Sequence, residues 1–319
     1  MSTEHETRGE KGDILLEMRD IEIDGFSDER WHDIINGVDL TLRRGEVMGL
    51  IGESGAGKST LGKAAMGYVQ PGCRIKGGSI MFDGIDLRAA SENEKRQLWG
   101  SRIAYVAQSA AASFNPAHRL IDQTVEATIG HSISSESDAK SDAVELYDAL
   151  QLPDPGSIGD RYPHQVSGGQ LQRVMTAMAM SPRPDLIIFD EPTTALDVTT
   201  QVEVLVAMRD IVDKFHTAAI YITHDLAVVA QMADFIKVLR YGDEVEEAET
   251  RKMLSAPEQD YTKSLWSVRA LEKPEEKSED IVLSIKNVDA AYGNTVKVLH
   301  DVSIDVPRGS TVAVVGESG

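Results

Sequence analysis

The residues of this chain whose types and spacing most clearly suggest chemistry lie in a glycine-rich segment, Gly52–Ser59. It reads Gly-Glu-Ser-Gly-Ala-Gly-Lys-Ser and fits the pattern G-x-x-x-x-G-K-[ST] of a phosphate-binding loop. In such a loop, backbone N–H groups and a helix N-terminus surround the phosphates of a nucleotide. Lys58 can reach the β- and γ-phosphates, and Ser59 can bind Mg²⁺. The predicted nucleotide-contacting residues of this loop are Gly52, Glu53, Ser54, Gly55, Ala56, Gly57, Lys58, Ser59 and Thr60.

Two acidic residues follow an apolar segment, Asp185–Phe189, that is expected to be a buried strand. Ligands of open α/β sheets bind at the carboxyl ends of the strands, which is where Asp190 and Glu191 are placed. Asp190 is predicted to hold Mg²⁺ through water, and Glu191 to orient and deprotonate an attacking water molecule. General-base catalysis of this kind contributes about 10²–10⁴-fold to a rate. The alternative is an acid pair that only caps a strand. The presence of a phosphate loop in the same chain makes this alternative the weaker interpretation.

Polar residues at two further strand ends are candidates for the same site. Gln108 follows an expected strand and is predicted to contact the Mg²⁺ or the attacking water. His224 follows another expected strand and is predicted to hydrogen-bond the γ-phosphate. A single histidine is more often structural than catalytic, and that reading is kept for His5, His32, His118, His131, His164, His216 and His300.

A second glycine-containing motif, Ser167-Gly168-Gly169-Gln170, precedes Leu171–Met180, which is expected to be helical. Its hydroxyl and glycine N–H groups at the helix start would form a second anion-binding site. The alternative is a helix N-cap whose glycines permit tight packing. The motif alone does not decide between the two.

The elements that position these residues alternate between strands and helices. Such alternation predicts an α/β fold with a parallel or mixed sheet covered on both faces. An expected helix, Lys58–Met66, follows the phosphate loop, and the mainly helical stretch between Gln108 and Asp185 is long enough to form a separate lobe. The expected strands are Val47–Ile51, Ser79–Phe82, Arg102–Ala107, Asp185–Phe189, Ala218–Thr223, Phe235–Leu239 and Glu244–Glu246.

These motifs occur in the order found in ABC-type ATPases, which the chain resembles over nearly all of residues 14–271. The resemblance implies a P-loop NTPase with a mixed or parallel sheet core, an antiparallel β subdomain, and a helical subdomain at about residues 109–182. It also implies ATP and Mg²⁺ as cofactors, and contact of Ser167–Gln170 with the nucleotide of a facing ATPase domain. The segments similar to the Walker A, Q-loop, signature, Walker B, D-loop and switch-histidine elements are Gly52–Thr60, Gln108, Val166–Val174, Leu186–Pro192, Ala195–Asp197 and Ile222–Asp225.

Shorter segments are similar to the ATPases of peptide, nickel and glutathione importers. The chain differs from this group in Val166, where leucine is usual, and in the less polar Ser109–Ser113 that follows the Q-loop. It also lacks a C-terminal cysteine cluster, so no iron–sulfur cluster is expected. Either Phe26 or Trp31 is expected to stack on adenine, with Tyr292 as the counterpart in a second copy of the domain. The similar segments are Phe114–Pro116, Tyr162–His164 and Asp260–Leu265.

The chain also holds the start of a second copy of its domain. Ile14–Ile21 aligns with Ile281–Val288 at an offset of 267 residues (281 − 14), and Gly316–Gly319 repeats the first four residues of the phosphate loop. A repeat of this length indicates a duplicated domain rather than a solenoid. The predicted parts are a flexible tail at 1–13, an ABC ATPase domain at 14–271, a charged linker at 272–280, and the first strands of a second, truncated ABC ATPase domain at 281–319.

Composition narrows the class of protein further. The formal net charge is −20, which argues against a nucleic-acid partner, because such binding requires clustered Lys and Arg. A single cysteine, Cys73, excludes a disulfide framework within the chain. No run of about 18 apolar residues is present, so a role at a membrane would depend on a partner.

These features together predict the ATP-hydrolysing subunit of a membrane importer for peptides or related small solutes, peripheral on the cytoplasmic face of the membrane. The expected partners are transmembrane permease subunits, a second ABC ATPase domain in the same full-length chain or in a homodimer, and, indirectly, an extracytoplasmic solute-binding protein. A soluble tandem ABC ATPase associated with ribosomes or DNA is the main alternative, but it would favour basic patches or long charged insertions. A non-catalytic nucleotide-gated module and a simple P-loop kinase explain fewer of the motifs.

Overall fold

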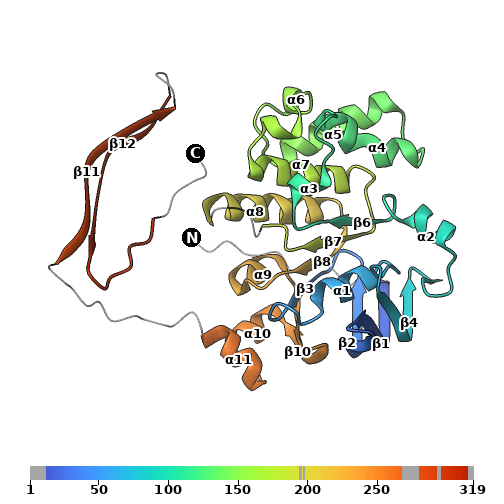
Figure 1. Cartoon of the computed structure of the whole chain (residues 1–319). Helices are drawn as coiled ribbons and strands as arrows, with labels where there is room; N and C mark the ends of the chain where they lie inside the picture. The colour runs from blue at the N-terminus through green and yellow to red at the C-terminus, as the bar shows by residue number, and fades with distance from the viewer. Residues whose placement is uncertain (1–11, 194–195, 197, 268–279, 293–295, 315–319) are drawn as a thin grey trace, which may run out of the picture. The chain divides into compact units, whose positions relative to one another are not determined.

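The computed structural model describes residues 12–193, 196, 198–267, 280–292 and 296–314. The chain divides into two compact units, one running to Trp266 apart from Asp197–Thr199, and one containing the residues from Ser267 onward. Figure 1 shows the elements of both units in chain order. Among the described residues, no helix is long and apolar enough to cross a membrane. The predicted linker, parts of the expected D-loop and Gly316–Gly319 lie outside the described residues.

A six-stranded mixed sheet forms the centre of the first unit, in the order β10-β9-β3-β8-β7-β6. Neighbouring strands are parallel from β9 to β6, and β10 is antiparallel to β9. The strands expected for this sheet are confirmed, with ends that shift by at most three residues. Their bounds are β3 Val47–Ile51, β6 Ile103–Val106, β7 Leu186–Asp190, β8 Ala218–Ile222, β9 Phe235–Arg240 and β10 Asp243–Glu249.

Successive side chains along each strand point to opposite faces of the sheet, and both faces are buried. On β7, Ile187 and Phe189 join a core formed with helices, whereas Leu186 and Ile188 join a core on the opposite face. Because both faces are covered, β3, β7 and β8 are buried at every residue and read as continuous apolar runs up to Asp190. This explains why the sequence shows unbroken apolar segments here.

Helices cover the two faces of the sheet unequally. Helix α1, which is Lys58–Ala64, packs through Leu61 and Ala64 on the face that carries Ile188. Helix α7 and the helix that follows β7 pack on the other face. The bounds of the α-helices after α1 are α2 Glu92–Leu98, α3 Ala110–Ser113, α4 Leu120–Gly130, α5 Glu136–Ala149, α6 Pro155–Ile158, α7 Gly168–Met180, α8 Val198–Lys214, α9 Leu226–Met232, α10 Thr250–Ser255 and α11 Asp260–Ser267.

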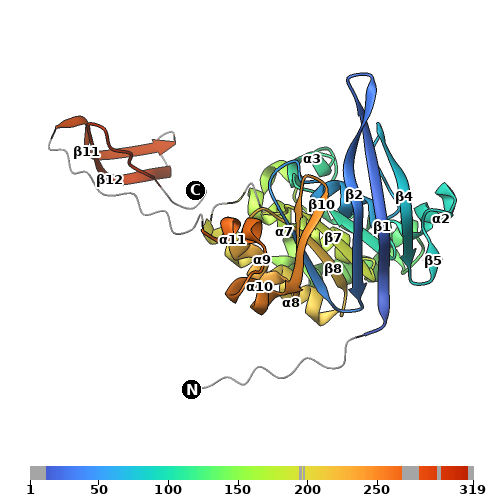
Figure 2. The same ribbon diagram turned by 90° about the horizontal axis from the view of Figure 1, so that it is seen from below.

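The second sheet of this unit is antiparallel, with the strand order β2-β1-β4-β5. Its inner face joins the core that α1 also joins, and Figure 2 shows its long strands beside the central sheet. Cys73 is the first residue of β4. The strands are β1 Ile14–Ser27, β2 Arg30–Arg43, β4 Cys73–Phe82 and β5 Ile85–Asp86.

Helices α3 to α7 form the helical part of the first unit, seen in green in Figure 1. Helix α6 begins at Pro155, since proline suits the first turn of a helix. The predicted fold class is confirmed in this unit: an α/β core with a mixed sheet, an antiparallel β part and a helical part.

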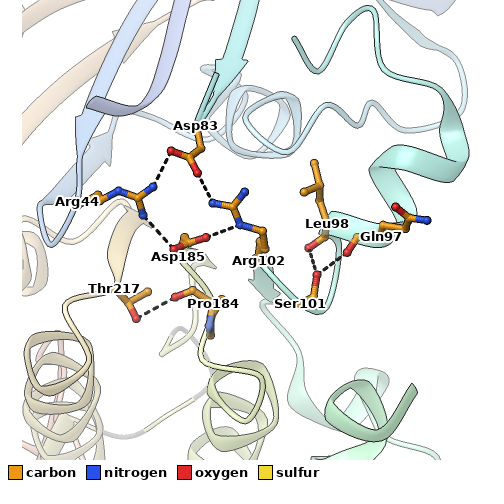
Figure 3. A network of polar contacts seen from close by, with 9 residues as sticks. All are labelled: Arg44, Asp83, Gln97, Leu98, Ser101, Arg102, Pro184, Asp185 and Thr217. Carbon is orange, nitrogen blue, oxygen red and sulfur yellow. Dashed lines mark hydrogen bonds and ion pairs between the residues drawn. The ribbon is translucent and has the colours of Figure 1, made fainter. Parts of the chain in front are cut away.

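A closed ring of four charged side chains joins the two sheets at the amino ends of β6 and β7 (Figure 3). Arg44 contacts Asp83 at 2.6 Å and Asp185 at 3.0 Å. Arg102 contacts Asp185 at 2.6 Å and also pairs with Asp83. The ring connects the turn after β2, the turn after β4 and the starts of β6 and β7, so it fixes the antiparallel sheet to the base of the core.

The second unit contains one antiparallel hairpin, β11 Ile281–Tyr292 with β12 Val296–Pro307. Its register repeats that of β1 with β2: Ile285 lies opposite Ile304 as Met18 lies opposite Leu40. The local irregularities repeat as well. Asn287 has φ 50° and its N–H donates to Ser303 Oγ, as Asp20 has φ 51° and its N–H donates to Asp39 Oδ1.

Candidate functional site

Four neighbouring strands of the central sheet deliver the predicted site residues. The strands β3, β8, β7 and β6 are consecutive in the sheet and parallel, so their carboxyl ends lie at one edge. The phosphate loop follows β3, His224 follows β8, Asp190 and Glu191 end β7, and Gln108 follows β6. Residues separated by more than 160 positions in the chain thereby meet at one edge of the sheet.

The glycines of the phosphate loop are required by close neighbours. Gly57 has φ 93°, and a Cβ there would lie 2.6 Å from Ile35 Cδ1 on β2. Gly52 has φ 150°, and a Cβ there would lie 2.2 Å from the carbonyl oxygen of Leu239. A larger residue at Gly52 would displace the backbone of β9, and one at Gly57 would strain φ and displace the Ile35 side chain. The antiparallel sheet and β9 therefore hold the loop from two sides.

Lys58 lies inside the loop, and only 5% of the residue is exposed. Its ammonium donates hydrogen bonds to the carbonyl oxygens of Gly52 and Glu53, at 2.8 and 3.0 Å. Burial lowers the pKa of Lys58, and the carboxylates of Glu191 and Asp190 oppose that shift. The cation is thus positioned within the segment predicted to surround the phosphates.

Asp190 is held by two hydroxyl groups. Ser59 Oγ donates to Asp190 Oδ1 at 2.7 Å, and Tyr105 Oη donates to Asp190 Oδ2 at 2.5 Å. Burial, together with the bond to Asp190, raises the pKa of Tyr105. Among the residues that the structure describes, no group of three His, Cys, Asp or Glu side chains could hold a metal ion alone. The pair of Ser59 and Asp190 nevertheless suits Mg²⁺, which takes few protein oxygens and completes its shell with phosphate and water.

Glu191 connects two of the other predicted residues. Gln108 Nε2 donates to Glu191 Oε2, and His224 Nδ1 lies against Glu191 Oε1, both at 3.2 Å. Glu191 itself has φ 48°, a left-handed conformation that is uncommon for residues other than glycine. Its N–H donates to the carbonyl oxygen of Ile222 at the end of β8. Gln108, Glu191 and His224 are therefore brought together, and contact of Gln108 with Mg²⁺ or the attacking water stays a prediction.

The second glycine-containing motif forms the start of α7 and not part of this site. Ser167 is the N-cap: its Oγ accepts from the Gln170 N–H at 3.3 Å, and Gln170 Oε1 accepts from the Ser167 N–H at 3.1 Å. Within the described part of the chain, no hydrogen bond joins Ser167–Gln170 to the phosphate loop. The N-cap reading is confirmed for this state of the chain, and contact with a nucleotide stays a prediction.

The two candidate adenine-stacking residues form a single cluster at the tip of the β1–β2 hairpin. The rings of Phe26 and Trp31 lie 5.3 Å apart, and the Arg74 guanidinium lies 3.9 Å from the Trp31 ring centre. Both aromatic residues are exposed. The structure does not separate the two candidates, and a stacking role stays a prediction.

Two contacts at the site were not predicted from the sequence. Tyr105 reaches Asp190 because both lie on the same face of adjacent strands, which alternation could have revealed once the strand order was known. Tyr261 of α11 accepts a hydrogen bond from the Glu53 N–H at 3.3 Å, and the Arg240 guanidinium lies over its ring at 4.5 Å. No local pattern links α11 to the phosphate loop, since they lie 208 residues apart.

A groove of about 960 Å³ lies at the opposite edge of the central sheet. It is lined by residues that precede β3 and β9, among them Glu46 and Asp234, and by Arg251. None of the predicted site residues lines it. The side chains that line the groove carry charges of both signs, so they do not indicate one class of ligand. The residues predicted to bind nucleotide lie instead at the carboxyl ends of the strands.

The fold and the site together define an α/β protein with a phosphate-binding loop at the carboxyl edge of its central sheet. A family model described as ABC transporter matches residues 35–194. The chain belongs to the ABC transporter family, as one of its ATP-binding ATPases. The resemblance expected from the six ordered motifs is thereby confirmed.

Several transport proteins are similar in sequence over most of the chain. The dipeptide transport ATP-binding protein DppD of Escherichia coli (strain K12) is 40% identical over 237 residues, which cover 74% of this chain and 72% of DppD. The oligopeptide transport ATP-binding protein OppD of Lactococcus lactis subsp. cremoris (strain SK11) is 36% identical over 267 residues, or 84% of this chain and 78% of OppD.

Solved structures agree with the fold. A dimeric post-hydrolysis structure of the ATP-binding cassette MJ0796 bound to ADP and Pi matches with a TM-score of 0.66 at 22% identity. The match covers 74% of this chain and 99% of that one. At this identity the match supports the ATP-binding cassette fold and not the roles of single residues.

Proposed function

We propose that this chain is the ATP-hydrolysing subunit of a membrane importer for peptides or related small solutes. The observation that carries hydrolysis is the placement of Glu191 between Gln108 and His224, next to the pair of Ser59 and Asp190. The names of relatives such as DppD and OppD support the class of solute. No observation favours the soluble alternative acting on ribosomes or DNA.

The arrangement supports hydrolysis by positioning and charge stabilisation. Lys58 would move from the loop carbonyls toward the β- and γ-phosphates, and Ser59 and Asp190 would hold Mg²⁺. The metal ion, when bound, supplies charge neutralisation at the phosphate oxygens. Glu191 would accept a proton from the attacking water, whose oxygen bonds the γ-phosphorus while the bond to the ADP oxygen breaks. Gln108 and His224, which already contact Glu191, would orient the water and the γ-phosphate.

The signature residues of this chain would serve a different nucleotide. Ser167–Gln170 contact one another and not the phosphate loop of their own unit. We therefore propose that they complete the site of a facing ABC ATPase domain, which completes this one in return. That domain would be the second one that begins at β11, or another copy of the chain. Transmembrane permease subunits would hold the pair at the cytoplasmic face of the membrane, and a solute-binding protein would deliver solute to the permease.

Substituting Glu191→Gln tests the catalytic proposal. The amide keeps the size of the side chain and one of its two acceptor oxygens but cannot accept the proton, so ATP binding should persist while turnover falls about 10²-fold or more. Calorimetry would measure binding and phosphate release would measure turnover. Glu126→Gln, an exposed substitution on α4, is the control and should change neither. Turnover within a few-fold of the parent in the Glu191→Gln variant would remove Glu191 as the base.

The facing-domain proposal has a separate test. If the site is completed by another copy, the turnover per molecule of residues 1–319 should rise with protein concentration. A rate that is independent of concentration and typical of transporters would show that one unit suffices. Adding the permease subunits in vesicles, with a peptide-loaded binding protein, should stimulate the rate; stimulation by ribosomes or DNA instead would support the soluble alternative.

A further inference from the structure

We infer that Tyr105 is a positioning residue for the metal-binding carboxylate of Asp190. This inference rests on the proposed function, because it concerns the Mg²⁺ that Ser59 and Asp190 would hold. Tyr105 was not among the residues predicted from sequence motifs. Its assignment comes from where β6 places its side chain.

The pleat of two adjacent strands brings Tyr105 to Asp190. On β6, Ile103 and Tyr105 belong to the same core as Ile188 of β7, whereas Ala104 and Val106 belong to the core on the opposite face. Tyr105 lies opposite Ile188 in the parallel register. Side chains two residues apart on a strand share a face, so Asp190, two residues beyond Ile188, lies on the same side as Tyr105. The phenol is long enough to span that step, and its oxygen reaches Asp190 Oδ2 at 2.5 Å.

The two carboxylate oxygens of Asp190 have different partners. Oδ2 accepts from Tyr105, and Oδ1 accepts from Ser59 at 2.7 Å. A carboxylate held at one oxygen by a fixed donor cannot rotate freely about its Cβ–Cγ bond. Tyr105 therefore keeps Oδ1 turned toward Ser59, which places both protein oxygens of the metal site side by side before a metal arrives.

The ring of Tyr105 is itself held in place. It is half-buried and packs against the core formed by α1 and the inner faces of both sheets. Because the ring is already fixed, the Tyr105 hydroxyl loses little conformational freedom when it donates its hydrogen bond to Asp190. Groups of this kind, which orient a metal ligand without touching the metal, typically change metal affinity by about 10–100-fold when removed.

Tyr105→Phe removes the hydroxyl and retains the ring. The expected result is unchanged affinity for a non-hydrolysable ATP analogue in EDTA, and about 10-fold weaker affinity for the same analogue with Mg²⁺. Isothermal titration calorimetry of the full chain measures both values, and their ratio reports how strongly the metal contributes. Because no turnover is measured, the readout is independent of catalysis.

Matched variants separate positioning from a general loss of structure. Tyr147→Phe also removes a buried hydroxyl, which bonds Thr124 between α4 and α5, and should leave the ratio unchanged. Tyr105→Met also lacks a donor and should reproduce the loss, so it carries the test if Tyr105→Phe fails to fold by circular dichroism. A ratio equal to that of the parent in either folded Tyr105 variant would overturn the inference. If the parent itself gains no affinity from Mg²⁺, the proposed function fails instead.

Discussion

At the scale of single residues, Glu191 shows how the site combines chemistry with backbone geometry. The strand β7 ends at Asp190, and the next residue turns into a left-handed conformation with φ 48°. Residues held in such sparsely populated regions cluster at functional sites, where the surrounding structure stabilises them. Here the Glu191 N–H bonds the end of β8, and its side chain meets Gln108 and His224.

Lys58→Ala tests the role of the buried lysine in binding. The ammonium is enclosed by the loop, so its loss should weaken ATP binding about 10-fold or more, as expected for a charge-assisted contact to phosphate. Lys63→Ala is the control on the same helix, because Lys63 is in the last turn of α1 and bonds Gln70. Calorimetry with ATP should separate them, and equal affinity of the two variants would contradict the role given to Lys58.

The types and positions of the chemical residues could be predicted from the sequence because each motif is local. Gly52–Ser59 requires only a strand before it and a helix after it, and both are present. The bonds of Gln108 and Tyr105 could not be predicted, since they depend on which strands are neighbours. That β6 lies beside β7 is a property of the sheet order and not of any segment.

At the scale of elements, the side chain of Ser167 at the start of α7 has two roles, one observed and one predicted. Ser167 caps the helix in this state, and the same hydroxyl is predicted to meet the nucleotide of a facing domain. The cap is reciprocal, with Gln170 bonding back to the Ser167 N–H, so two hydrogen bonds fix the start of the helix. A second capping box of the same kind, Ser91 with Glu94, begins α2 outside the predicted site residues.

Ser167→Ala and Ser91→Ala form a matched pair that separates these uses. Each should lower the free energy of unfolding by about 1 kcal/mol, because each removes an N-cap. Urea titration measures that loss. Only Ser167→Ala should also reduce ATP turnover beyond the effect on stability. Equal turnover in the two variants would leave Ser167 with a capping role alone.

Element boundaries were predictable where patterns are strong and less so elsewhere. The run Val47–Ile51 matches β3 residue for residue. The bulges of β1 and β2 were not predictable, since a register shift such as that between Ile23 and Asp24 depends on pairing with a partner strand.

At the scale of the whole unit, the ring of Arg44, Asp83, Arg102 and Asp185 connects the two sheets (Figure 3). Hydrogen bonds from Arg102 and then Arg44 hold the pKa of Asp83 below its usual value. The ionised form is therefore favoured in the folded state. Its contribution to stability is fully present above the unfolded pKa of about 4 and is lost as the pH falls through the lower folded value.

Asp83→Asn tests this contribution. At pH 7 the variant should be less stable by about 1 kcal/mol, a modest value because the side chains are about one-third exposed and solvent screens them. The difference between parent and variant should shrink as the pH falls below about 4, because the Asp83 carboxylate then gains a proton in the unfolded chain before it does so in the folded one. Urea titrations at several pH values measure it. Asp160→Asn, which breaks an exposed pair with Arg119, should cost less; a pH-independent difference for Asp83→Asn would contradict the argument.

The pairing of the hairpin in the second unit determines how fast its backbone amide hydrogens should exchange with water. In the first unit, β1 pairs on both sides, with β2 and β4, whereas β11 pairs with β12 alone among the described strands. Leu283 and Leu299, which correspond to the buried Leu16 and Ile35 of the first unit, are exposed. A ribbon of two strands is marginally stable in water. In deuterated buffer its amides should therefore become labelled long before those of β7 and β8, and slow labelling would reveal that something else has covered the ribbon.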